Sequence, residues 1–107
     1  MNKLVITRPP SLDTALKWIG IYSRHQHFNE RMTGEQAHRA AATFLAVRCA
    51  MGLDILGKSW RKHRHVAAKC GELFDRIISE DVYRQSNVVF DVDIELRHPS
   101  GGDRHGE

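Results

Sequence analysis

The chain is poor in the features that mark membrane and secreted proteins. It has two cysteines, at positions 49 and 70, which are too few for a disulfide framework and indicate a reducing compartment. Its uncharged apolar stretches fall well short of the ~18 residues that a membrane span needs. The N-terminus lacks the apolar segment and cleavage site of a signal peptide. We therefore expect a cytoplasmic protein without a membrane contact.

Sequence motifs that carry catalysis are also missing. The chain has no glycine-rich phosphate loop, no nucleophile elbow and no Walker lysine. Cys49 and Cys70 fall on apolar helical stripes, which is typical of small buried residues and not of activated thiols. We expect neither enzymatic activity nor a cofactor.

Seven histidines raise the question of a metal site. Cys49, His63, His65 and Cys70 are ligand types that zinc accepts, but their spacing matches no zinc-binding pattern. If His63 and His65 lie on one helix, their side chains point about 160° apart and cannot hold the same ion. No metal site is predicted.

Charge is distributed unevenly along the chain, although the formal net charge is only +3. Residues 1–69 carry 12 Lys+Arg and 4 Asp+Glu, a net charge of +8, whereas residues 70–107 carry 4 Lys+Arg and 9 Asp+Glu, a net charge of −5. Such an asymmetry between the two halves indicates charged partners.

The hydrophobic pattern predicts a small α+β domain in the order β-α-α-α-β. With 107 residues, of which 41% are hydrophobic and 27% charged, the chain fits one domain. We expect this domain to span residues 1–98, with a flexible tail over 99–107. The two terminal strands should pair, with three helices packed on them. The expected elements are a strand over 2–8, a helix over 12–25, a helix from the Thr33 cap to before Gly57, a helix over 60–79 and a strand over 88–96.

Local signals support the first two helices. Ser11 is a favourable N-cap, and Thr33 with Gln36 forms a capping box. Small side chains on one face of the second helix let another element or a partner approach closely, which leaves a homodimer open. These side chains are Ala42, Ala46 and Ala50.

The most informative stretch is a basic cluster at the start of the third predicted helix. Five Lys/Arg and two His fall within the twelve residues 58–69, together with one tryptophan. Cations at the positive end of a helix dipole are unfavourable by several tenths of a kcal/mol each, so the cluster suggests an anion-binding role. The alternative is a solvated basic face with its tryptophan packed on the domain. The candidate partner-binding residues are Lys58, Trp60, Arg61, Lys62, Arg64, His65 and Lys69.

A secondary candidate is the acidic face of the last strand, formed by Asp91, Asp93 and Glu95. Period-two alternation places these acids on one face, about 7 Å apart. The alternative is that this is the ordinary polar face that an amphipathic strand exposes to solvent. A metal-dependent hydrolase that uses Asp91 and Asp93 with a histidine is the last-ranked function.

These observations favour a small non-catalytic binding protein. The build is typical of phage and mobile-element accessory proteins, and no family motif is present. We expect it to inhibit or modulate bacterial nucleic-acid-handling machinery (a nuclease, a CRISPR-type complex or a repair complex) by protein–protein contact. The alternative is a DNA- or RNA-binding regulator that places Arg61, Lys62, Arg64 and Lys69 on phosphates. The turn over 52–57 gives only a weak helix-turn-helix signal.

Overall fold

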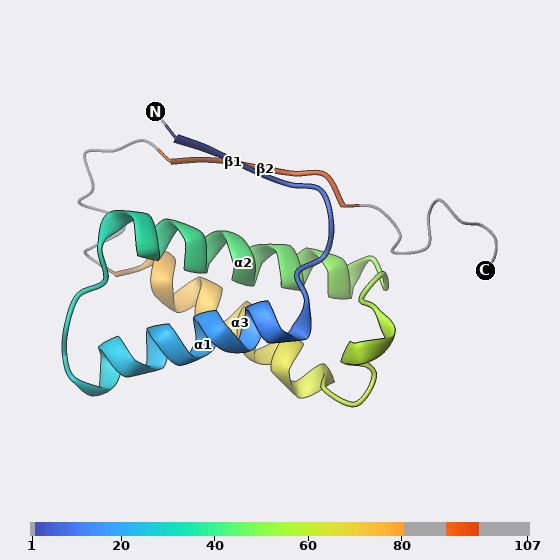
Figure 1. The fold of residues 1–107 in the computed structure, drawn as a ribbon, viewed down its shortest axis with the longest axis horizontal. Helices are drawn as coiled ribbons and strands as arrows, with labels where there is room; N and C mark the ends of the chain where they lie inside the picture. Colours follow the sequence, from blue (N-terminus) through green and yellow to red (C-terminus); the bar gives the residue numbers. More distant parts are fainter. Residues whose placement is uncertain (1, 81–89, 97–107) are drawn as a thin grey trace.

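The computed structural model describes residues 2–80 and 90–96, which form a small α+β domain with three helices and a two-stranded parallel sheet. The predicted tail over 99–107 and the predicted domain end at residue 98 lie outside these residues. In chain order the elements are β1 (Asn2–Ile6), α1 (Leu12–His27), α2 (Gly34–Gly52), the 3-10 turn η1 (Lys58–Trp60), α3 (Arg64–Ile78) and β2 (Phe90–Ile94), as Figure 1 shows.

The predicted N-caps of the first two helices are confirmed. The Ser11 hydroxyl accepts from the Thr14 backbone N–H, and Thr33 and Gln36 form the reciprocal capping box at the start of α2. Both motifs satisfy backbone donors that the first turn of a helix leaves unpaired. The two starts are therefore specified by local sequence.

The C-terminal ends of α1 and α2 share one motif, with a non-glycine residue in the left-handed conformation. Asn29 (φ 53°) follows α1 and Asp54 (φ 57°) follows α2. After each, the next backbone N–H returns to a carbonyl five residues back, from Glu30 to His25 at 2.8 Å and from Ile55 to Ala50 at 3.0 Å. This is the Schellman arrangement, and Asn and Asp tolerate it better than most residues. It ends α2 at Gly52, earlier than predicted.

The third helix begins later than the predicted residue 60. Residues 58–60 form η1, and α3 starts at Arg64, with His63 as an N-cap that makes no side-chain hydrogen bond. The reason lies in Trp60, whose indole N–H donates to the Pro10 carbonyl at 3.2 Å. Burying this ring against a segment fifty residues away holds the chain in a tight turn before the helix can begin.

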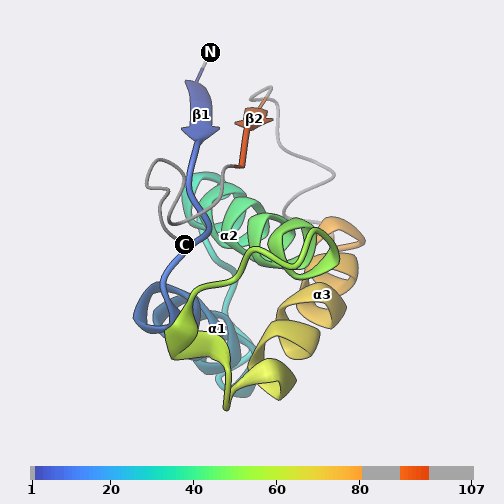
Figure 2. The same cartoon turned by 90° about the vertical axis from the view of Figure 1, so that its right-hand side faces the viewer.

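The core lies among the three helices, with α2 at its centre. Phe44 of α2 is fully buried and meets Tyr22 of α1 edge to face, with ring centroids 6.3 Å apart. Val47 continues this face, and Ala67 and Leu73 of α3 pack on the same cluster. Figure 2 shows α1 and α3 on one side of α2 and the two strands on the other.

The predicted small α+β domain is confirmed, and the strand pair packs mainly on α2 rather than evenly on all three helices (Figure 2). The strands pair in parallel, with Leu4 opposite Val92 and Ile6 opposite Ile94. In both views this strand pair lies along α2, whereas α1 and α3 lie on the far side of that helix and pack on its apolar face (Figures 1 and 2).

The small face of α2 is covered within the chain. Ala42, Ala46 and Ala50 are 1% exposed or less, yet they lie outside the cluster shared by the helices. Their small side chains let neighbouring chain approach α2 closely on this face. A homodimer through this face stays an untested prediction.

No helix among the described residues has the length and apolar character required to cross a membrane.

Candidate binding site

The predicted basic residues gather where η1 passes into α3. Six of the seven are exposed, and we call these six the basic corner. Lys58 comes from η1, two residues come from the turn that follows it, and three come from the first half of α3. The basic corner consists of Lys58, Arg61, Lys62, Arg64, His65 and Lys69.

The seventh predicted residue, Trp60, belongs to the core. Its side chain is 2% exposed, and its N–H is bonded to Pro10. The indole is therefore almost fully enclosed, unlike the other six side chains, and a contact between Trp60 and a partner stays a prediction. Its role is to fix the corner to the segment that leads into α1.

Three of the five Lys and Arg side chains of the basic corner carry no counter-charge within the described part of the chain. Arg64 lies 3.8 Å from Asp54 and Lys69 lies 3.8 Å from Glu72, and both pairs are exposed. Such loose surface pairs are worth little. Lys58, Arg61 and Lys62 have no ion-pair partner among residues 2–80 and 90–96.

The first turn of α3 adds to the positive potential of the corner. No acidic residue lies in that turn, and His63 does not cap it. The backbone N–H groups at a helix start carry partial positive charge, and nearby cations reinforce it. The corner is thus electropositive through both its side chains and its backbone.

His63, which is not part of the basic corner, lies closer to His65 than the predicted helical angle implied. The rings of His63 and His65 are 6.0 Å apart, because His63 precedes the helix and the helical angle does not apply to it. Within the described ranges, no group of three or more His, Cys, Asp or Glu is placed to hold a metal ion.

The cysteines lie in different surroundings. Cys49 is partly exposed, whereas Cys70 is fully buried, and burial raises the pKa of the Cys70 thiol to about 11. A thiol with so high a pKa stays protonated at neutral pH and is a poor nucleophile.

A hollow of about 190 Å³ opens within the basic corner, and we call it the corner hollow. It lies between the end of α2 and the start of α3, and sequence reasoning did not predict it. Asp54 follows the end of α2 in the left-handed conformation and borders the hollow. The available sequence signal was this Asp between Gly52 and Gly57, because Asp tolerates that conformation. The hollow is lined by Lys58, Arg61 and Arg64, by Met51, Leu56 and Trp60, and by Asp54 and Gly57.

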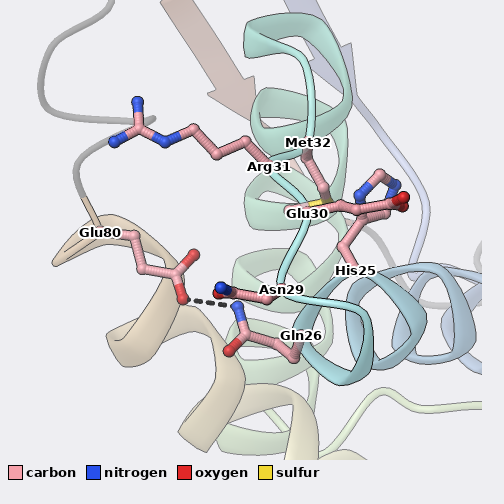
Figure 3. A pocket seen from close by; sticks show the side chains of 7 residues that line it. All are labelled: His25, Gln26, Asn29, Glu30, Arg31, Met32 and Glu80. Carbon is pink, nitrogen blue, oxygen red and sulfur yellow. Dashed lines mark hydrogen bonds between the residues drawn. The ribbon is translucent and has the colours of Figure 1, made fainter.

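A second hollow, of about 220 Å³, lies at the C-terminal ends of α1 and α3 (Figure 3). Its best-defined group is Glu80, whose Oε2 accepts from the Tyr22 hydroxyl at 2.8 Å and from the Gln26 amide at 2.9 Å. Burial and this carboxylate raise the pKa of Tyr22. The carboxylate thus ties the end of α3 to α1.

The acidic strand face lies away from the basic corner. Asp93 and Glu95 are exposed, and the side chain of Asp91 lies outside what the structure describes. Figure 2 places β2 and η1 on opposite sides of α2. The two candidate surfaces are therefore separate.

Comparisons with known proteins give no relative: no protein-family model matches the chain, and no curated protein or solved structure is detectably similar to it.

Proposed function

We propose that this protein is a non-catalytic binding protein whose basic corner docks on an anionic surface of a partner. One observation carries the proposal: three exposed cations, Lys58, Arg61 and Lys62, lie together without an ion-pair partner in the described part of the chain. Grouped like charges repel one another, and an oppositely charged partner relieves that repulsion and speeds association.

The partner we propose is a protein of bacterial nucleic-acid-handling machinery, such as a nuclease, a CRISPR-type complex or a repair complex. The dipolar charge map supports this choice, since a basic surface can compete for sites that attract cations, and an acidic strand can face a groove built for nucleic acid. By occupying such a surface the protein would inhibit or modulate its host complex without chemistry of its own.

The test is capture of partners from a bacterial lysate with the full chain as bait. The variant carries Arg61→Glu, Lys62→Glu and Arg64→Glu, which we call the corner triple. The matched control carries Lys17→Glu, Arg24→Glu and Arg39→Glu, which change the net charge equally at exposed positions on α1 and α2. We expect the corner triple to lose the captured protein and the control to keep it. Equal capture by both variants would refute the proposal.

Direct nucleic-acid binding is the alternative, and a salt series distinguishes it from docking on a protein. Binding through phosphates falls steeply as salt rises, because each contact releases counter-ions. A gel shift with duplex DNA and with RNA at low salt would support the alternative if the shift disappears in the corner triple. We expect no shift with the wild-type chain.

A further inference from the structure

The corner hollow is lined by both charged and apolar side chains, whereas a surface that only faces solvent does not need the apolar ones. Met51 and Leu56 line it together with Lys58, Arg61 and Arg64. Leu53, between Met51 and Asp54 in the chain, is 61% exposed and is among the most exposed large hydrophobic residues of the described chain. The corner therefore offers an occupant both cations and apolar surface.

The size of the hollow limits what can occupy it. Small-molecule sites measure roughly 300–1,000 Å³, and the corner hollow measures about 190 Å³. It is too small for a nucleotide or an organic cofactor. It suits one side chain that a larger partner inserts.

The charge of the residues that line the hollow determines which charge the inserted side chain carries. Three cations and one acid, Asp54, border the hollow, and the Arg64–Asp54 separation of 3.8 Å is long for a hydrogen-bonded pair. Arginine forms its strongest and most directional contacts with carboxylates and phosphates, often through two parallel hydrogen bonds. The inserted group is therefore an anion.

We infer that the corner hollow receives the carboxylate of an acidic side chain that stands beside an apolar residue in a segment of the partner protein. This inference rests on the proposed docking function and names the chemistry of the docked segment. The carboxylate pairs with Arg61 and Arg64, and the neighbouring apolar side chain covers Met51 and Leu53. Methionine adapts its shape to varied partners, and Met and Arg are enriched at protein interfaces.

The apolar share of the corner favours a protein segment over nucleic acid. Phosphate contacts are made by cations, polar side chains and backbone N–H groups, and they gain nothing from an exposed leucine or methionine. A nucleic acid lying across the corner would use the charges and leave the hollow itself unfilled.

Gly57 allows the hollow to be blocked without changing any charge. It lines the hollow, a Cβ built there meets no atom within 4 Å, and its φ of −70° is open to any residue. Gly57→Leu therefore adds an apolar side chain at the hollow and keeps every cation. Gly20→Leu is the matched control, because a Cβ at Gly20, on the exposed side of α1, also meets no atom within 4 Å.

The experiment selects peptides from a displayed library of random 12-residue sequences, with the full wild-type chain as bait, and measures their affinities by fluorescence anisotropy. We expect the enriched peptides to carry an Asp or Glu next to an apolar residue. Excluding an anchor side chain weakens an interface by about tenfold or more. Gly57→Leu should therefore weaken binding by about tenfold, the corner triple should do so at least as strongly, and Gly20→Leu should have no effect.

Several outcomes would overturn the inference. Enriched peptides without carboxylates, no enrichment, or equal affinity for Gly57→Leu and the wild type would each do so. If lysate capture survives Gly57→Leu but is lost in the corner triple, the docking function stands and the role of the hollow fails.

Two further results would assign the corner to another occupant. If a labelled oligothymidine binds the wild type and Gly57→Leu equally but does not bind the corner triple, the corner binds nucleic acid. Light scattering that shows a dimer, dissociated by Gly57→Leu, assigns the hollow to a second copy. Circular dichroism, with Gly57→Met as a second blocking variant, checks that the fold is kept.

Discussion

Helix α2 buries ten of its nineteen residues, whereas the basic corner, which starts at Lys58 shortly after α2 ends, exposes all six of its side chains. In α2, the buried side chains are small or aromatic because they must fit the space between the surrounding elements. In the corner, the cations make two loose ion pairs among the described residues, and the fold gains little from either. The difference shows that packing accounts for the side chains of α2 but not for the exposed cations of the corner, for which we propose a docking role.

The largest effect should come from emptying the centre of the core. Phe44→Ala removes a fully buried ring that meets Tyr22 edge to face, and such truncations lower the free energy of unfolding by about 3–5 kcal/mol. Chemical denaturation measures the change. Leu16→Ala, at a position that is 46% exposed, is the control and should lower the free energy of unfolding much less, by about 1 kcal/mol or below. Similar losses in the two variants would mean that the core is not centred on α2.

Trp60 joins the two regions, so its replacement should have the next largest effect. Trp60→Phe keeps an aromatic ring but removes the donor to the Pro10 carbonyl, and losing one partner of a buried hydrogen bond lowers the stability by about 1–3 kcal/mol. Trp18→Phe, at a partly buried position on α1, should lower it less. A Trp60 variant as stable as the wild type would show that the corner is not fixed through this contact.

The capping signals of α1 and α2 could be read directly from the sequence, because Ser11, Thr33 and Gln36 act within one helical turn. The start of α3 could not, because it depends on the burial of Trp60 against Pro10, a contact between distant positions. The exposure of Arg61, Lys62 and Arg64 could be predicted, because they fall outside the apolar stripe of the third helix. The corner hollow was not, since it forms only where the end of α2 meets the start of α3.

His38 gives the stability of the packed region a dependence on pH. The side chain is 3% exposed, and burial, followed by the charge of Arg39, lowers the pKa of His38, while Glu35 acts in the opposite direction. In the unfolded chain the imidazole has its ordinary pKa of about 6.5, so the unfolded state binds more protons below that pH. The stabilising contribution is present above about pH 6.5 and is lost as the pH falls.

Thermal unfolding at pH 7.5 and pH 5.5 measures this effect. We expect the wild type to lose stability at pH 5.5 and His38→Gln to lose less. An identical loss in both proteins would place the responsible group elsewhere.

The comparison between the two regions is tested most directly by the stability of the corner triple. Reversing Arg61, Lys62 and Arg64 breaks one loose ion pair, with Asp54, and places an acid in the first turn of α3, where the helix dipole favours it. The account predicts a free energy of unfolding within about 0.5 kcal/mol of the wild type in chemical denaturation. A loss of about 2 kcal/mol or more would show that these cations hold the fold together and would contradict the assignment of the corner to a partner.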